Sequence, residues 1–126
     1  MSLNLIRVKN GSTPNEEYVS LRAKSDLNLK GYAIVDRTFD DNEQVSNEFR
    51  HIYVFPSWDV KEGDYVRLYT GKSKGNKTLE TETGTIFHVF FWQSDECVWN
   101  DNGNDRASLI SYKFLKMVNV PAIEKK

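Results

Sequence analysis

Short runs of β-branched and aromatic residues, separated by turn-forming residues, repeat along this chain. Such spacing is typical of an all-β sandwich or barrel, and no amphipathic helical pattern interrupts it. The pattern predicts strands at Leu3–Val8, Glu17–Ala23, Tyr32–Arg37, His51–Phe55, Tyr65–Thr70, Thr85–Trp92, Ala107–Tyr112 and Phe114–Val118.

The alternation within three of these strands predicts how each is buried. In Glu17–Ala23 and Tyr65–Thr70, apolar and polar positions alternate, so each strand should have one face in the core and one in water. In Thr85–Trp92 both alternating sets are apolar. We therefore expect Thr85–Trp92 to be covered on both faces and to be the most buried strand.

The connections between strands follow turn chemistry. Gly31 and Gly63 stand where a positive φ or a close approach would strain any side chain. Two longer polar connections, the acidic Thr38–Glu48 and the lysine-rich Gly71–Gly84, are candidate functional loops, because irregular segments on a rigid sandwich often carry binding. The alternative is that both are solvated connectors.

Length and composition favour one soluble domain spanning residues 1–126. The 126 residues suffice for one core, and the formal net charge of −1 gives no overall field that would attract nucleic acid or acidic membranes. Cys97 is the only cysteine, so an internal disulfide is excluded and a reducing compartment is the simpler expectation. Neither a signal peptide nor a membrane-spanning apolar run is seen, so we expect a cytoplasmic chain without membrane insertion.

Catalytic residues are not indicated by any local motif. His51 and His88 are the only histidines and both fall inside predicted strands, where partly buried histidines are common. Cys97 follows Asp95 and Glu96, whose charges oppose formation of a thiolate, so it is expected to be a packing residue. We expect no enzymatic activity and no cofactor.

A metal site is only weakly suggested. Asp101, Gly103 and Asp105 alternate like the start of a calcium loop, but Arg106 and Tyr112 stand where that loop needs glycine and glutamate. A polar hairpin turn explains the segment better, and no metal is expected.

The sharper candidate is an aromatic and basic binding surface. Tyr65, Arg67 and Tyr69 share one strand face. If the strand His51–Phe55 lies alongside, its residues His51, Tyr53 and Phe55 extend that face. The strand leads into a loop that carries Lys72, Lys74 and Lys77. Aromatic faces stack on bases or sugars, and lysines attract phosphates or acidic protein surfaces. The alternative is that cross-strand tyrosine pairs only stabilise an exposed sheet.

Five segments, in order, resemble the lamin tail domain, a small immunoglobulin-like β-sandwich. The match covers about residues 17–109, with Tyr32 in place of a tryptophan, Ser20 in place of an acidic residue, Glu62 in place of a proline and Asn104 as an extra turn residue. The segments are Glu17-Tyr18-Val19-Ser20-Leu21, Leu29-Lys30-Gly31-Tyr32-Ala33-Ile34-Val35-Asp36, Tyr53-Val54-Phe55-Pro56, Val60-Lys61-Glu62-Gly63-Asp64-Tyr65-Val66 and Trp99-Asn100-Asp101-Asn102-Gly103-Asn104-Asp105-Arg106-Ala107-Ser108-Leu109.

The resemblance implies a two-layer immunoglobulin-like sandwich of about eight mostly antiparallel strands. Its structural signature would be Gly31, Gly63, Trp99, Gly103 and Asp105, with Trp99 as a core anchor. Members of this family serve as binding or scaffolding units in nuclear filament proteins and as attachments to bacterial hydrolases and nucleases. The resemblance therefore suggests a stand-alone, bacterial-type interaction module that binds a protein partner or self-associates, possible alternatives being a nucleic-acid or polysaccharide binder and an enzyme of unrecognised type.

Overall fold

The computed structural model describes residues 2–39, 45–99 and 105–123, and these residues form strands and loops with one short 3₁₀ turn. The all-β sandwich class predicted from the sequence is confirmed. The elements are β1 (Leu3–Lys9), η1 (Pro14–Glu16), β2 (Tyr18–Ala23), β3 (Leu27–Asn28), β4 (Tyr32–Phe39), β5 (Val45–Val54), β6 (Asp59–Val60), β7 (Tyr65–Tyr69), β8 (Lys77–Glu80), β9 (Ile86–Phe91) and β10 (Asp105–Ser111).

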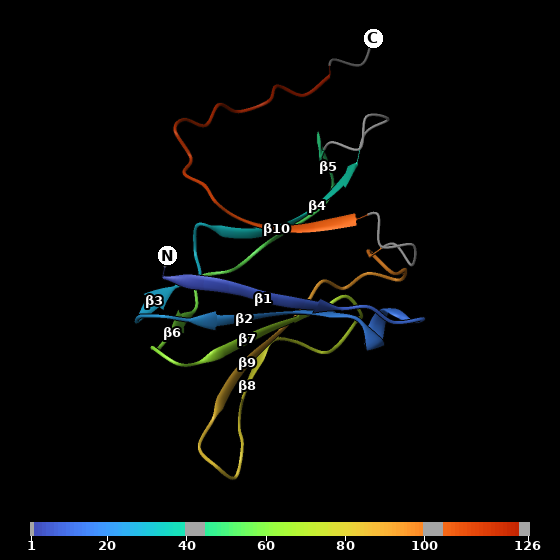
Figure 1. The fold of residues 1–126 in the computed structure, drawn as a ribbon. Coiled ribbons are helices and arrows are strands. Elements are labelled where there is room, and N and C mark those ends of the chain that lie inside the picture. Colours follow the sequence, from blue (N-terminus) through green and yellow to red (C-terminus); the bar gives the residue numbers. More distant parts are fainter. Residues whose placement is uncertain (1, 40–44, 100–104, 124–126) are drawn as a thin grey trace.

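Two sheets form the layers of the sandwich (Figure 1). The larger sheet has the strand order β1-β2-β7-β9-β8, and the smaller one has the order β10-β4-β5. A two-stranded sheet of β3 and β6 lies at one end. The described pairings are antiparallel except for that of β7 with β9, which is parallel.

The core lies between the two layers. Side chains on the inner positions of both sheets alternate with outward-facing ones, as the period of two in a strand requires. The buried cluster contains Leu3, Val19, Leu21, Ala23, Leu29, Ile34, Phe55, Val60, Val66, Leu68, Phe90, Val98 and Trp99.

The predicted burial of the strands is partly wrong. In β7 the alternation is as expected, with Val66 and Leu68 buried between half-buried neighbours. Strand β2 is more buried than β9, because Tyr18 and Ser20 on its outer face are also buried. The side chain of Arg67 lies over the ring of Tyr18 and covers that outer face.

Three predicted segments differ from the structure. The Gly71–Gly84 connection contains the edge strand β8, and most of the described part of Thr38–Glu48 continues β4 and β5. The predicted strand Phe114–Val118 is wrong, since that segment pairs with nothing in the described residues and is exposed. Its strand-favouring residues cannot form a strand without a neighbour to pair with.

Much of the predicted structural signature can be followed in the structure. Trp99 is 5% exposed and belongs to the core cluster, as expected of an anchor. Gly31 and Gly63 have φ of 93° and 90°, a region that favours glycine. Asp105 begins β10 opposite Thr38, whereas Gly103 lies outside the described residues.

A buried carboxylate connects the beginning of β2 with the Trp99 segment. Glu17 is fully buried, and its Oε1 accepts hydrogen bonds from the backbone N–H groups of Val98, at 2.7 Å, and Trp99, at 3.4 Å. These bonds join residues more than 80 positions apart and hold Trp99 against the core.

Replacing Glu17 with alanine should lower the free energy of unfolding by about 1–3 kcal/mol, because the buried N–H of Val98 loses its acceptor. Glu17→Gln keeps an oxygen at this position and should cost less. Urea unfolding of the two variants and the parent measures the difference. Equal stability of Glu17→Ala and the parent would contradict a role for the carboxylate in holding this segment.

Within the described part of the chain there is no helix with the length and apolarity needed to cross a lipid bilayer.

Candidate functional site

The outer face of the five-stranded sheet gathers aromatic and cationic side chains. The registers place Tyr65 opposite Phe87, and Tyr69 between Tyr18 and Phe91. Since alternate residues of a strand share a face, these side chains and Arg67 all project away from the core. We call this set the cationic aromatic face: Tyr18, Arg22, Tyr65, Arg67, Tyr69, Phe87 and Phe91.

The rings of this face pack against one another across the strands. Tyr65 stacks on Phe87 with ring centroids 5.2 Å apart and planes 20° apart, and Tyr69 stacks on Phe91 at 5.8 Å and 21°. Tyr18 meets Tyr69 at 5.3 Å. In each stacked pair, one face of each ring is therefore covered by its partner.

Cations lie over three of these rings, those of Tyr18, Tyr65 and Phe87. The guanidinium of Arg67 lies 4.6 Å from the ring centroid of Tyr18 and 4.9 Å from that of Phe87, and Arg22 lies 5.4 Å from that of Tyr65. Lys9 covers Tyr18 at 5.8 Å. Such pairs occur about once per 70–80 residues, so their concentration on one face marks it as unusual.

Arg67 is a half-buried cation of this face with few hydrogen bonds. Its Nε is buried without a hydrogen-bond partner, and Nη1 donates a long bond of 3.5 Å to the hydroxyl of Tyr69. Within the described residues no carboxylate forms an ion pair with it. A guanidinium carries five N–H donors in a planar fork that suits carboxylates and phosphates. The buried Nε is not open to a ligand, so a ligand would bind the Nη groups of the guanidinium.

A shallow pocket of about 650 Å³ opens on this face, between β7, β9, β8 and the loop that follows β7. Pockets of this size are typical of ligand sites. Its apolar lining comes from Leu79, Phe87, Val89 and Phe91. Its charged lining consists of Arg67, Lys72, Lys77 and Glu80, so cations outnumber the single carboxylate.

The predicted lysine loop is placed beside this pocket. Lys72 and Lys77 line the pocket, whereas Lys74 is exposed and does not contribute to the lining. Lys72 is 2.5 Å from Asp95, an exposed ion pair. The loop is fixed to the chain after β9, because Gln93 accepts a hydrogen bond from the N–H of Ser73 and donates one to its carbonyl.

The predicted contribution of Tyr53 to this face is wrong. β5 belongs to the three-stranded sheet, and Tyr53 points inwards, where it contacts Phe55 at 5.1 Å and Trp92 at 5.8 Å. Burial raises the pKa of the Tyr53 phenol, an effect partly opposed by its hydrogen bond with Asn76. The sequence showed which residues of β5 share a face but not which sheet the strand joins.

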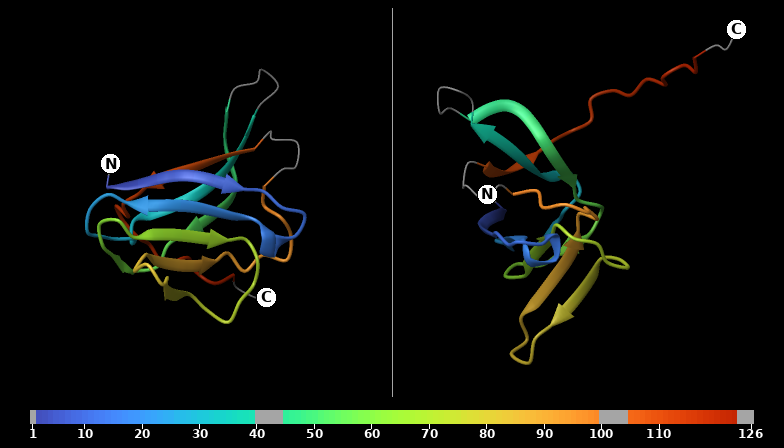
Figure 2. Two further views of the ribbon diagram at one scale, coloured as in Figure 1. Left: turned by 60° about the horizontal axis from the view of Figure 1, so that its bottom comes forward. Right: turned by 90° about the vertical axis from the view of Figure 1, so that its right-hand side faces the viewer.

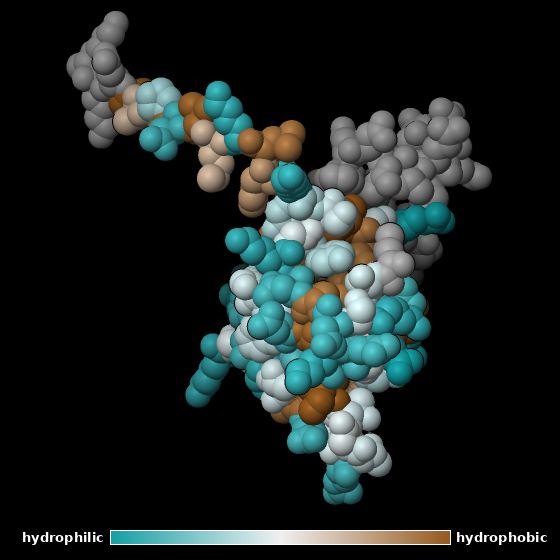
Figure 3. All heavy atoms as spheres, turned by 90° about the vertical axis from the view of Figure 1, so that its left-hand side faces the viewer, coloured by the Kyte–Doolittle hydropathy of each residue, from teal (hydrophilic) through white to brown (hydrophobic). Residues whose placement is uncertain are grey.

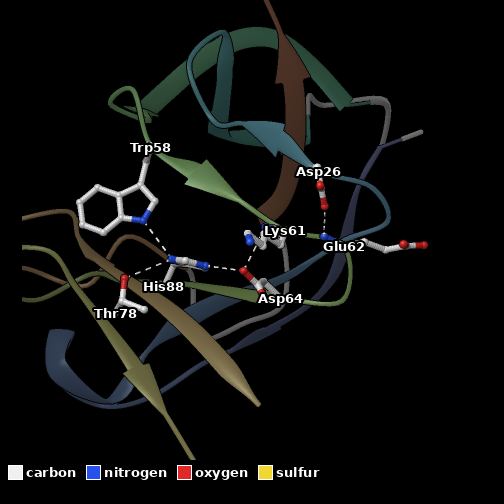
Figure 4. Close-up of polar contacts among 7 residues, drawn as sticks. All are labelled: Asp26, Trp58, Lys61, Glu62, Asp64, Thr78 and His88. Carbon is white, nitrogen blue, oxygen red and sulfur yellow. Dashed lines mark hydrogen bonds and ion pairs between the residues drawn. The ribbon is translucent and has the colours of Figure 1, made fainter. Parts of the chain in front are cut away.

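His88 forms the most extensive polar cluster in the described chain (Figure 4). Its Nε2 lies 2.7 Å from Asp64 Oδ2, so the proton is placed on Nε2 and donated to the carboxylate. Nδ1 then accepts from Nε1–H of Trp58 at 2.9 Å, with the hydroxyl of Thr78 at 3.2 Å. Because its lone pair is used by Trp58, His88 is arranged to connect strands rather than to accept a substrate proton.

The same cluster fixes the turn before β7. Asp64 Oδ2 also accepts from the backbone N–H of Lys61, and Asp26 accepts from that of Glu62 (Figure 4). His51, the other histidine, lies 2.9 Å from the buried Asp36. Neither histidine lines the pocket of the cationic aromatic face.

Metal ligands do not gather in the described residues as a group of three or more. The calcium-like positions Asp101 and Gly103 lie outside those residues. Sequence reasoning missed Phe87, Phe91 and Leu79 as members of the site. The sequence pattern of Thr85–Trp92 could have indicated Phe87 and Phe91, because a strand that is apolar on both faces is expected to be covered on both.

Comparison of the sequence with protein-family models gave no match, and comparison with curated proteins gave none either.

Proposed function

We propose that this chain is a non-catalytic interaction module of the lamin tail type that binds an acidic segment of a protein partner on its cationic aromatic face. The resemblance to that family supports the module type, and the sandwich with a buried Trp99 is compatible with it. A single cysteine fits a reducing compartment, so we propose that it acts in the cytoplasm.

The observation that carries this proposal is the environment of the Arg67 guanidinium. Two rings hold the guanidinium in position, yet its donors have no carboxylate to bind among the described residues. A guanidinium that is held in position, has few hydrogen bonds and lies beside an apolar pocket fits a particular kind of ligand, one with a carboxylate next to an apolar side chain. A peptide with alternating acidic and apolar residues has this chemistry.

The packing of the rings favours a peptide over a nucleic acid. Binding of single-stranded nucleic acid uses aromatic faces on which bases stack. Here the faces of Tyr65 and Tyr69 are stacked on Phe87 and Phe91, and that of Tyr18 is covered by Arg67. These covered faces are not free to stack on a base.

The test is a titration of the isotope-labelled protein with four probes, followed by NMR. The probes are a peptide of alternating glutamate and leucine, the same peptide with glutamine for glutamate, a heparin oligosaccharide and a thymidine oligonucleotide. We expect the acidic peptide to shift resonances of β7 and β9. Stronger binding of the oligonucleotide or heparin would overturn the peptide proposal.

Arg67→Ala should weaken binding of the acidic peptide at least about tenfold, because charged hydrogen bonds contribute about 1.5–3 kcal/mol each. Arg67→Lys keeps the charge but loses the fork, so it should recover only part of the affinity. Lys30→Ala removes one exposed charge away from the face and serves as the control. Equal loss in Lys30→Ala and Arg67→Ala would show that only net charge matters.

A further inference from the structure

The C-terminal tail, residues 113–123, is an apolar segment that pairs with no strand of the described residues, and its Phe114 ring contacts only the neighbouring ring of Tyr112, at 5.3 Å. It follows β10, where the N–H of Tyr112 donates to the carbonyl of Gly31 at 2.9 Å. Beyond that bond it extends away from the sandwich (Figures 1 and 2). Figure 3 shows brown, hydrophobic residues along this projecting segment.

The exposure of the tail is exceptional for side chains of this type. Phe114 is 71% exposed, Leu115 is 90% and Met117 is 83%. Val118, Val120 and Ile123 are 77%, 90% and 93% exposed. A contiguous run of such residues marks an interaction site, because isolated soluble proteins rarely leave large apolar patches in water.

An acceptor for such a segment exists on the outer face of the three-stranded sheet. Ile52 and Val54 of β5 are 50% and 47% exposed, and they point outwards because Tyr53 between them points to the core. They lie beside Ala33 and Val35 of β4, which are fully buried, so the accessible part of this face comes from β5. We call this set the β5 face: Ala33, Val35, Ile52, Val54 and Ile110.

The backbone edge of β5 is also open. Among the described residues β5 pairs with β4 alone, so its other side presents unpaired N–H and C=O groups. Such an edge accepts an added strand, with backbone hydrogen bonds supplying affinity and side-chain contacts supplying register.

Charge distinguishes the β5 face from the cationic aromatic face as a site for the tail. The tail carries Lys113 and Lys116, and no acidic residue occurs between positions 106 and 123. Arg67 and Lys77 would repel these lysines, whereas the residues of the β5 face are uncharged.

We propose that the tail of one copy of this chain adds as a strand to the β5 edge of a second copy, and that reciprocal exchange forms a twofold dimer. The tail begins at β10, the opposite edge of its sheet from β5, and leads away from its own body. One chain thus carries both an unpaired strand and an unpaired edge, and two copies satisfy each other through a self-complementary interface. Pro121 has no N–H, so it ends the added strand.

Light scattering after size-exclusion chromatography, over a wide range of concentrations, tests the proposal. The parent should be a dimer, and the dimer should be lost in Ile52→Lys and in a tail variant that combines Phe114→Ser, Leu115→Ser and Met117→Ser. Ile6→Lys is the matched control, because Ile6 on the other sheet is 48% exposed. It should leave the dimer intact.

A mixing experiment separates tail exchange from simple contact between two apolar faces. The Ile52→Lys chain keeps its tail and the tail variant keeps its β5 face, so one tail–edge contact can form in the mixed pair. Mixing the two monomeric variants should therefore restore a dimer. A parent that stays monomeric, a dimer that survives both variants, or a mixture that stays monomeric overturns the proposal.

Discussion

Replacing Trp99 with alanine should lower the free energy of unfolding by about 3–5 kcal/mol, the usual cost of deleting a buried aromatic side chain. The indole is 5% exposed and meets Trp92 edge to face, with centroids 6.2 Å apart. Its removal leaves a cavity in the core beside the hydrogen bonds that Glu17 accepts from this segment. Urea unfolding followed by circular dichroism measures the loss without relying on tryptophan fluorescence.

Trp99→Phe and Leu79→Ala serve as the comparisons for that experiment. The indole Nε1 of Trp99 is buried without a hydrogen-bond partner in the described residues, so a phenylalanine gives up volume but no hydrogen bond and should cost less. Leu79 is 48% exposed, and Leu79→Ala should have a much smaller effect. A Trp99→Ala variant as stable as the parent would contradict the position of Trp99 in the core.

Features determined by local chemistry could be predicted from the sequence. Gly31 and Gly63 were assigned to strained backbone from turn context, and both have positive φ. Trp99 was assigned to the core because a large aromatic side chain in a small sandwich has few other places to be buried. The strand β7 was assigned its inner and outer faces from alternation alone.

Features determined by long-range strand pairing could not be predicted from the sequence. β7 and β9 are parallel neighbours, and β8 lies at the sheet edge beyond β9 although it precedes β9 in the chain. Nothing in Lys77–Glu80 signals a strand until β9 provides a partner. The pocket of the cationic aromatic face depends on this arrangement, so Leu79 could not be assigned to it from sequence.

In the tail, the sequence predicted a strand at Phe114–Val118 that the structure does not contain. Its apolar residues favour a strand, but strand preference reflects packing against neighbours, and the described residues of the same chain offer none. Among the described residues of one chain, the tail has no strand to pair with, and the β5 edge has no added strand.

Phe55→Ala should also cost about 3–5 kcal/mol of unfolding free energy, although the sequence placed Phe55 on a binding surface with Tyr53. The side chain is 2% exposed and meets Phe90 edge to face at 5.2 Å. Urea unfolding measures this loss, which should appear as a lower midpoint with an unchanged slope, since the surface exposed on unfolding hardly changes.

Tyr65→Ala is the matched comparison for Phe55→Ala, because Tyr65 does lie on the cationic aromatic face and is only half buried. It should cost less stability than Phe55→Ala but weaken binding of the acidic peptide. Phe55→Ala, measured under conditions where it remains folded, should bind that peptide like the parent. A small stability loss in Phe55→Ala combined with weakened binding would return Phe55 to the surface and contradict the placement of β5 in the three-stranded sheet. The two variants therefore separate core from binding face through opposite effects on two measurements.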